Sequence, residues 1–425
     1  MKLARKPVKA KDRDWDVIVI GGGASGMMAA GRAAELGASV LVLEKNKTVG
    51  NKLAITGGGR CNITNAEFDT RELLKHYGSA EQYLYSPFAQ FGVQDTFTFF
   101  EKLKIPFVIE ARKRAFPKSQ KATDVVRAMR DYMRDGKVSI DFETTVRKLQ
   151  TNGDRISGVM CEGKTYTAKN VIIATGGTSH PETGSTGDGF AWLKKLGHTV
   201  RASNPTLVPL RTRTKWIPPL SGVSLSFMKI TFFLDGKKAF SKTGKLLFTH
   251  FGLSGPLILN SSYEVSELLD QGAVTAKIDM YPDTDAGALD KRIVNTIDAN
   301  KNKNFVNLLD EIVPHGMDTT VASLLNITDS NLKAHSFTKE DRKKLVTLLK
   351  GAPVEIAGLM GQDRAIVSDG GIVLDEIDTK TMRSRLFQNL YLTGDIIDIN
   401  RLSGGYSLQL CWTTGFVAGT AAAGR

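Results

Sequence analysis

A glycine-rich turn directly after a buried strand constrains the fold of this chain more than any other feature. Gly21, Gly23 and Gly26 form the pattern G-x-G-x-x-G, and the β-branched run VIVI at 17–20 precedes them. In this pattern the first glycine permits a tight turn, the second leaves room for a pyrophosphate beside the backbone, and the third lets a helix pack closely on the strand. The turn therefore predicts the start of a doubly wound α/β domain that binds a dinucleotide.

The residues after the turn complete the same unit. From Ala24 to Leu36, small and apolar residues recur at helical spacing, and Gly37 then ends the helix. The N–H groups at the helix start, around Ala24 and Ser25, would bind the phosphates. A second buried strand, SVLVLE, ends in Glu44, 18 residues beyond the last glycine of the turn. An acid at this place accepts hydrogen bonds from the adenosine ribose and repels a 2′-phosphate, so NADP is disfavoured at this site.

A long glycine-rich segment after Glu44 favours FAD over NAD as the ligand. It reads KNKTVGNKLAITGGGRCNITN at 45–65, where a simple NAD domain would soon continue into a helix and a strand. We expect this segment to be a long loop, in which the glycine, threonine and asparagine residues offer backbone N–H groups to a large ligand and Arg60 can meet a phosphate. The expected cofactor contacts in this segment are Lys45, Lys52, Thr56, Gly58, Gly59, Arg60, Cys61 and Asn62.

The composition is that of an ordinary soluble globular protein, with 41% hydrophobic and 24% charged residues in a chain of 425. No apolar run approaches the roughly 20 residues of a membrane-spanning helix. The basic N-terminus lacks the apolar core of a secretory signal. We therefore expect a cytoplasmic protein without a membrane partner.

Three cysteines, Cys61, Cys161 and Cys411, lie far apart in the sequence. An odd number without a CxxC pair argues against a disulfide framework, a zinc site and a dithiol redox pair, so we expect no metal. Cys61, next to Arg60, is either an activated thiol or a buried inert one.

The chain is strongly basic. Its net charge is +13, and residues 2–13 hold six lysines and arginines against one aspartate. Smaller basic clusters occur at 112–121 (RKRAFPKSQK) and 341–350 (DRKKLVTLLK). The sequence carries no RNA-binding signature, so we expect a solvated basic surface, with a nucleic-acid or acidic-ligand surface as the alternative.

Together these motifs resemble those of the BaiN/HI0933-like flavoproteins, bacterial FAD-binding proteins of the glutathione-reductase-like fold. The resemblance rests on DVIVIGGGASGMMAA, LEKN and GNKLAITGGGRCNITN in the first 65 residues and on three later blocks. These blocks are VIIATGGTSHPETGSTGDGFAWLKKLGH at 171–198, LLFTHFGLSGPLIL at 246–259 and NLYLTGDIIDINRLSGGYSLQLCWTTGFVAG at 389–419. The last block departs from the family pattern, because Ser407 stands in the place of an asparagine. Members are described as aminoacetone oxidases or bile-acid-intermediate reductases, so the resemblance leaves the substrate open.

Four further stretches are expected to contact FAD. The first is the start of a predicted β-meander, which offers backbone groups to adenine. The second is a glycine turn after a strand, beside the adenosine and the pyrophosphate. The third is an acid at a strand end, suited to a ribityl hydroxyl, and the fourth is a helix N-terminus at the pyrimidine edge of the flavin. Val146 belongs to the β-meander, and Thr175, Gly176 and Gly177 form the glycine turn. Gly394 and Asp395 lie at the strand end, and Gly404, Gly405 and Ser407 lie at the helix N-terminus.

The expected fold class is α/β, a split Rossmann-like FAD-binding domain with an inserted β-barrel-like and helical region. Residues 205–280 are rich in threonine, phenylalanine and valine and contain turn signals, which suggests a small β-barrel-like unit. Residues 282–350 have helical spacing, with Thr338 and Asp341 as a capping pair. The expected division is a basic arm at 1–14, the first FAD-binding part at 15–200, a barrel-like subdomain at 201–281, a helical subdomain at 282–353 and the second FAD-binding part at 354–425.

These observations predict an FAD-dependent oxidoreductase that transfers a hydride between a small organic substrate and non-covalently bound FAD. NAD(P)H or oxygen would close the cycle, and the sequence holds no second G-x-G-x-x-G for a resident nicotinamide. Amine oxidation and enone reduction both stay open. The alternative is a flavin-binding protein that acts in RNA modification through its basic surface. The expected proton-handling or substrate-orienting residues are His250, Tyr406 and His180, and the oligomeric state is not predicted.

Overall fold

The computed structural model describes residues 14–206, 208–360 and 367–424, so residues 1–13 of the expected basic arm lie outside the described part. The described residues form two units, each with its own hydrophobic core. The first unit takes in the residues up to Pro205 and those from Val367 onward, and the second runs from Thr206 to Ile366.

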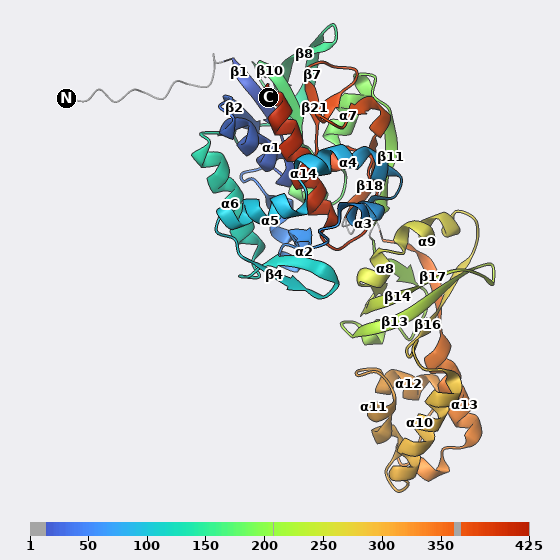
Figure 1. Ribbon diagram of the computed structural model, residues 1–425. Helices are drawn as coiled ribbons and strands as arrows, with labels where there is room; N and C mark the ends of the chain where they lie inside the picture. Colours follow the sequence, from blue (N-terminus) through green and yellow to red (C-terminus); the bar gives the residue numbers. More distant parts are fainter. Residues whose placement is uncertain (1–13, 207, 361–366, 425) are drawn as a thin grey trace. The chain divides into compact units, whose positions relative to one another are not determined.

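A seven-stranded sheet forms the centre of the first unit (Figure 1). In spatial order its strands are β19 (Ile377–Asp378), β20 (Arg383–Ser384), β21 (Leu390–Leu392), β10 (Ala168–Ile173), β1 (Trp15–Ile20), β2 (Val40–Leu43) and β6 (Ser139–Asp141). The five strands from β21 to β6 are parallel. Nearly every residue of β1 and β2 is buried, which agrees with their continuous apolar runs.

Two parallel helices, α1 (Ala24–Glu35) and α14 (Tyr406–Ala422), lie side by side on this sheet. Their backbones approach closely because two glycines of α14 face α1. A Cβ on Gly415 would lie 2.5 Å from the carbonyl oxygen of Ser25, and a Cβ on Gly419 would lie 2.4 Å from that of Ala29. The other α-helices of the unit are α2 (Asn51–Gly59), α3 (Thr70–Leu74), α4 (Glu81–Gln90), α5 (Val93–Lys102), α6 (Ala122–Asp135) and α7 (Asp188–Lys195).

Three smaller sheets complete the first unit. The predicted β-meander is present as β7 (Val146–Asn152), β8 (Arg155–Cys161) and β9 (Lys164–Tyr166). A second sheet has the order β3 (Thr64–Asn65), β5 (Arg114–Pro117) and β4 (Phe107–Glu110). The third pairs β11 (Val200–Thr206) with β18 (Val367–Ile372).

The second unit contains a closed six-stranded barrel. Its strand order is β12 (Leu210–Thr212), β15 (Gly252–Ser254), β14 (Lys237–Thr249), β13 (Ser224–Leu234), β16 (Val274–Asp279) and β17 (Ala352–Leu359). Its α-helices are α8 (Pro256–Leu259), α9 (Ser262–Leu269), α10 (Ala286–Ala299), α11 (Leu309–Ile312), α12 (Asp318–Leu324) and α13 (Lys339–Gly351). Thr338 and Asp341 form the expected capping box at the start of α13.

The α/β class with an inserted barrel and helices is confirmed, but the unit boundaries differ from the expected ones. The expected second FAD-binding part begins at 354, whereas β17 belongs to the barrel and the chain returns to the first unit at Val367. The reason is that β17 pairs with both β16 and β12 and so closes the barrel. At the other end the first unit extends to Pro205, beyond the expected boundary at 200. Within the described residues, no helix has the length and apolar content needed to cross a membrane.

Candidate dinucleotide site

The turn between β1 and α1 is shaped by contacts that only glycine permits. A Cβ on Gly21, where φ is +103°, would lie 2.6 Å from the carbonyl oxygen of Ala174, and a Cβ on Gly26 would lie 2.0 Å from that of Gly21. At Gly23, in contrast, a Cβ would meet no atom within 4 Å. The turn is therefore open at Gly23, where the first N–H groups of α1 have no partner within the helix. This open end fits a pyrophosphate.

Glu44, at the end of β2, is held against the same turn. Its carboxylate is buried, and Oε2 accepts a hydrogen bond of 2.7 Å from the N–H of Gly22. Oε1 accepts hydrogen bonds from the backbone N–H and the side-chain amide of Asn46, at 2.8 and 2.7 Å. A carboxylate offers about four lone-pair positions and three are used here, so Glu44 can still accept one hydrogen bond from a ribose hydroxyl.

Two further predicted stretches lie directly beside this turn. The Cα of Thr175, after β10, is 3.3 Å from the Cβ position of Gly21. After β21, a Cβ on Gly394 would lie 2.6 Å from Oγ of Ser25. Gly176 and Gly177 follow Thr175 in the same connection. The carboxyl ends of β1, β10 and β21 thus bring their turns together, as expected for a parallel sheet that binds a nucleotide at this edge.

Helix α2 occupies part of the segment in which we expected a loop. The N–H of Gly50, which precedes α2, donates to the carbonyl oxygen of Gly22 at 2.9 Å, so α2 begins beside the first turn. The helix ends in Gly57, Gly58 and Gly59, whose φ values are +59°, +67° and +81°. Three successive left-handed residues explain the glycine triplet, because other residues adopt this conformation at a cost.

Arg60 has its partners inside the protein. Its Nη1 lies 2.8 Å from Oε1 of Glu110 and 2.9 Å from Oε1 of Gln120, and its guanidinium stacks 4.1 Å above the centre of the Phe116 ring. We expected Arg60 to meet a phosphate, whereas in the structure its guanidinium is bound by Glu110 and Gln120. The physical reason is that the neighbouring strands β4 and β5 supply an anion and an aromatic face.

The two residues after Arg60 differ: Asn62 has a buried acceptor without a partner, and Cys61 has a buried thiol. Oδ1 of Asn62 is buried and accepts no hydrogen bond from the described residues. An unpaired buried acceptor is costly, so a ligand donor such as the flavin N3–H or a ribityl hydroxyl fits here. Cys61 is fully buried, and burial raises the pKa of its thiol to about 12. Of the two alternatives for Cys61, an activated thiol and a buried inert one, the structure therefore supports the inert one. Thr56 accepts the backbone N–H of Cys61 through its carbonyl oxygen.

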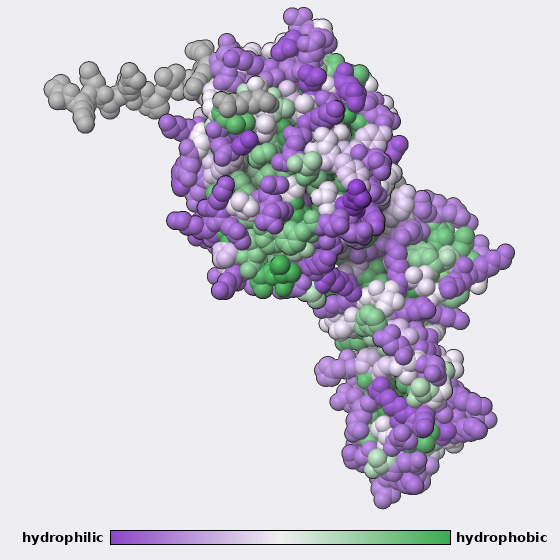
Figure 2. Space-filling view, viewed as in Figure 1, coloured by the Kyte–Doolittle hydropathy of each residue, from purple (hydrophilic) through white to green (hydrophobic). Residues whose placement is uncertain are grey.

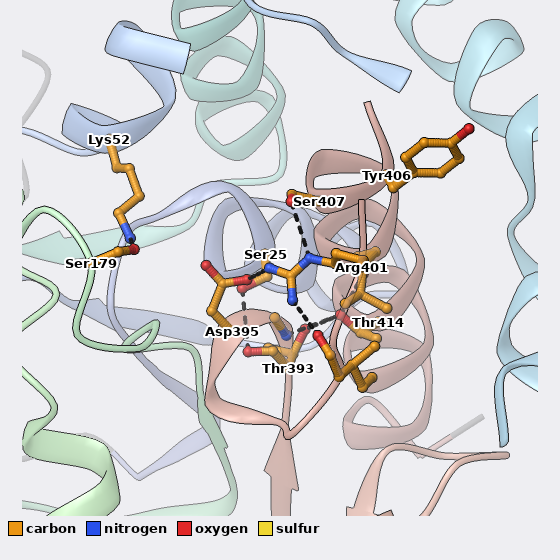
Figure 3. A network of polar contacts seen from close by, with 12 residues as sticks. Ser25, Lys52, Ser179, Thr393, Asp395, Arg401, Tyr406, Ser407 and Thr414 are labelled. Carbon is orange, nitrogen blue, oxygen red and sulfur yellow. Dashed lines mark hydrogen bonds and ion pairs between the residues drawn. The ribbon is translucent and has the colours of Figure 1, made fainter. Parts of the chain in front are cut away.

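Asp395, Arg401 and Ser407 form a polar network at the start of α14 (Figure 3). The guanidinium of Arg401 is buried and pairs with Oδ1 of Asp395. Its Nε donates to Oγ of Ser407 at 3.0 Å, and Nη1 donates to the carbonyl oxygen of Ile399 at 2.7 Å. Within the described residues Oδ2 of Asp395 accepts no hydrogen bond, so this oxygen can serve the predicted ribityl hydroxyl.

Lys52, on α2, adds a second basic group, which is half-buried. Its Nζ donates to Oγ of Ser179 at 2.8 Å, and none of the described carboxylates lies within ion-pair distance of it. Burial lowers the pKa of Lys52, and the charge of Asp395 opposes this shift. Burial would raise the pKa of Asp395, but the charges of Arg401 and Lys52 hold this pKa below its usual value. Two basic side chains thus act on one carboxylate, and an anionic ligand group would complete the cluster.

The start of α14 is tied to β3. Gly405 has a φ of +106°, and a Cβ there would lie 2.3 Å from the carbonyl carbon of Thr64. Nδ2 of Asn65 donates to the carbonyl oxygen of Gly404 at 3.0 Å. These contacts hold the N–H groups of the first turn of α14 in place, where they can stabilise negative charge on a ligand.

Tyr406, one of the three proton-handling candidates, is packed between other rings. Its ring lies 4.6 Å from that of His76 and 6.0 Å from that of Tyr77. Burial raises the pKa of the Tyr406 phenol to about 12. Figure 3 shows this ring directed away from the guanidinium of Arg401.

The two histidine candidates lie in different units. His180 follows Ser179 in the first unit, and its Nδ1 is 2.8 Å from Oε1 of Glu182. His250 lies in the second unit, on an exposed turn between β14 and β15. The structure therefore brings His180 near Lys52 through Ser179, while a role of His250 at the flavin stays a prediction.

Two predicted contacts lie near Glu44. Nζ of Lys45 pairs with Asp188 at 2.8 Å. Val146 is buried at the start of β7, and the N–H of Thr144 just before it donates to the carbonyl oxygen of Glu44 at 3.0 Å. Across residues 14–206, 208–360 and 367–424, no group of three or more histidine, cysteine, aspartate or glutamate side chains is arranged to hold a metal ion.

Arg401, Ser179 and Asn65 are parts of the site that the sequence prediction missed. Arg401 is a lone charged residue inside the block NRLSGGYSLQL, which is otherwise apolar, glycine-rich and uncharged. That contrast is a signal for a buried functional charge. Ser179 and Asn65 offer no comparable signal, because their contacts join residues more than 100 positions apart.

Comparisons with known proteins agree with this geometry. A model of the HI0933-like protein Rossmann domain matches residues 15–421. The chain is 30% identical to a 3-dehydro-bile acid delta(4,6)-reductase of Clostridium scindens, over 96% of this chain and 98% of the relative. It is 26% identical to a ribosomal RNA dihydrouridine synthase of Escherichia coli, over 94% and 96%. A 3-ketosteroid-delta4-(5alpha)-dehydrogenase from Rhodococcus jostii has a similar fold, with a TM-score of 0.54, 15% identity and 99% of both chains covered.

Replacement of Glu44 should loosen the cofactor much more than replacement of Arg60. Glu44→Gln removes a charged acceptor beside the turn, so we expect FAD to bind about tenfold more weakly or worse. Arg60→Gln is the matched control, because its partner Glu110 is part of the protein, and FAD affinity should stay within about threefold. Fluorescence of released FAD during titration measures both. Equal weakening would mean that Arg60 contacts a phosphate after all.

Arg401→Gln should destabilise the FAD-free protein by about 3–5 kcal/mol at neutral pH, because it leaves the carboxylate of Asp395 buried without its ion pair. In the unchanged protein the pKa of Asp395 lies below its unfolded value, so its stabilisation is present above about pH 4 and is lost as pH falls further. In the variant, Arg401 no longer opposes the effect of burial, so the pKa of Asp395 rises.

The destabilisation should therefore shrink as the pH falls toward about 4, since the orphaned carboxyl is then protonated. Denaturation followed by tryptophan fluorescence measures it, because Trp412 is fully buried in α14. Asp395→Asn is the control that lacks the titrating group. A loss of stability that is the same at all pH values would contradict the ion pair as its source.

Proposed function

This chain belongs to the HI0933-like family and is an FAD-dependent oxidoreductase, and on that premise we propose that it reduces a carbon–carbon double bond conjugated to a carbonyl group. The names of two relatives support this reaction class. A delta(4,6)-reductase of a 3-dehydro-bile acid and a dihydrouridine synthase both saturate such a bond, one in a steroid and the other in a uracil ring.

The proposed reaction balances with a nicotinamide as the reductant. A hydride adds to the carbon β to the carbonyl, a proton adds to the α carbon, and NAD(P)H becomes NAD(P)⁺. Bound FAD supplies the hydride transfer between the two. A transient nicotinamide is preferred because the sequence has no second G-x-G-x-x-G to hold a resident one.

The observation that carries the proposal is the basic cluster at the start of α14, in which the buried Arg401 pairs with Asp395 and the half-buried Lys52 acts on the same carboxylate. When a hydride adds to a conjugated double bond, negative charge moves toward the carbonyl oxygen. Preorganised positive groups in a water-poor site stabilise such charge. The N-terminus of α14 acts in the same direction. In this proposal Glu44 and Gly23 bind the nucleotide end, and the cluster acts at the reacting end.

The proton donor is one of the three predicted candidates. Tyr406 and His180 belong to the same unit as the cluster, and His250 belongs to the other. The phenol of Tyr406, with a pKa of about 12, stays protonated at neutral pH and can donate a proton but not act as a base.

The first candidate substrate is a small organic molecule.

Uridine in RNA is a second candidate substrate. The net charge of +13 and the similarity to a ribosomal RNA dihydrouridine synthase favour it. The chemistry is the same, because the double bond of uracil is conjugated to a ring carbonyl.

Anaerobic spectroscopy tests the proposed function. NADH or NADPH should bleach the visible absorbance of bound FAD, and a conjugated enone or a uridine-containing RNA should restore it without oxygen. The product should be two hydrogen atoms heavier than the substrate by mass spectrometry. Bleaching by an amine such as aminoacetone, with no response to either nicotinamide, would contradict the proposal and indicate an amine oxidase.

A further inference from the structure

The positive charge of this chain is concentrated in short segments. Residues 102–121 hold seven lysines and arginines and one glutamate, a net charge of +6 out of the +13 of the whole chain. We call this segment the basic hairpin. It runs from the end of α5 through β4 and β5 to the start of α6. The basic residues at 2–13 lie outside the described part of the chain.

Most of this charge is not neutralised within the protein. Lys113 pairs with Glu67, and Arg114 pairs with Glu110. The other five cations are exposed and have no acidic partner in the part of the chain that the structure describes: Lys102, Lys104, Arg112, Lys118 and Lys121. Five unpaired cations within 20 residues repel one another, and a polyanion would relieve this repulsion.

Apolar side chains are exposed on the same segment. Val108 and Ile109, on β4, are 36% and 53% exposed. Figure 2 shows an apolar patch where Figure 1 draws β4, with hydrophilic residues on either side of it. Phe68, on the neighbouring connection after β3, is 52% exposed and packs on Phe97 at 5.4 Å. Cations around an exposed aromatic face such as that of Phe68 are the arrangement that binds the backbone and bases of a single strand.

The basic hairpin is joined rigidly to the candidate dinucleotide site. Its turn has left-handed backbone at Arg112 and Lys113, with φ values of +61° and +56°. Nδ2 of Asn65 donates to the carbonyl oxygens of both Arg112 and Gly404, at 3.1 and 3.0 Å. One side chain therefore connects the tip of the basic hairpin to the start of α14. A strand bound along the hairpin would be held at a fixed distance from the site.

We infer that the basic hairpin binds the phosphate backbone of a single-stranded RNA and presents an unpaired uridine to the flavin. This surface rests on the second substrate of the proposed function and deepens it. Cations such as Arg112 and Lys118 contact phosphates, and the apolar faces of Phe68 and Ile109 contact bases.

The test compares two charge-matched variants of the full chain with bound FAD. The first replaces Arg112, Lys118 and Lys121 with glutamine. The second, as control, replaces Arg130, Lys194 and Lys195, which are exposed cations of α6 and α7 without acidic partners in the described residues. Visible absorbance of FAD verifies that both variants fold. The probe is short fluorescein-labelled polyuridylate, titrated at several salt concentrations.

We expect the unchanged protein and the control to bind with the same steep salt dependence. The hairpin variant should bind about tenfold more weakly or worse at low salt, and its slope of log Kobs against log salt should fall by about 2, at about 0.7 per phosphate contact on a single strand. An equal loss in the control would overturn the inference, as would salt-independent binding. Binding to phosphatidylserine vesicles in place of RNA would also overturn it.

The outcomes separate this surface from the proposed function. Reduction of an enone without hairpin-dependent RNA binding would overturn the surface and leave the proposed function standing. Hairpin-dependent RNA binding without reduction of any conjugated double bond would support the surface and contradict the proposed function.

Discussion

The candidate site depends on backbone segments that approach one another more closely than a Cβ atom permits. A Cβ on Gly21 would lie 2.6 Å from the carbonyl oxygen of Ala174, and a Cβ on Gly405 would lie 2.3 Å from the carbonyl carbon of Thr64. A Cβ on Gly394 would lie 2.6 Å from the side-chain Oγ of Ser25. These contacts join the ends of three strands and the starts of two helices. Where the main chain itself forms the walls, a ligand can reach its N–H groups without side chains in the way. Larger residues at these positions would separate the segments.

The charges of the site follow from this framework. The close approach around Gly394 and Gly405 buries the connection that carries Asp395 and Arg401. A buried guanidinium requires a carboxylate and further acceptors, and Arg401 has the carboxylate of Asp395, the hydroxyl of Ser407 and the carbonyl oxygen of Ile399. Lys52 reaches the same region from α2, whose start is fixed to the first turn. The result is a partly buried basic cluster suited to negative charge on a ligand, which is the property that reduction of a conjugated double bond uses.

Local patterns in the sequence predicted the parts of the fold that local physics determines. The strand ends, the first glycine turn, Glu44 and the capping box at Thr338 depend on neighbours within a few residues or on a known spacing. The partner of Arg60 could not be predicted, because Glu110 is 50 residues away on another strand. The same limit applies to β17, which joins the barrel through long-range pairing. Arg401 was visible as an isolated charge, but its three partners appear only in the folded chain.

The central claim is that separate turns of the first unit converge on one FAD. Hydrogen–deuterium exchange of the protein with and without FAD tests this most directly. Binding should slow amide exchange at residues 21–26, 44–46, 175–177 and 394–405 together, while the turn at Asp235 and Gly236 in the second unit should not change. Slower exchange at the first turn alone, with 394–405 unaffected, would contradict convergence on a single flavin nucleotide.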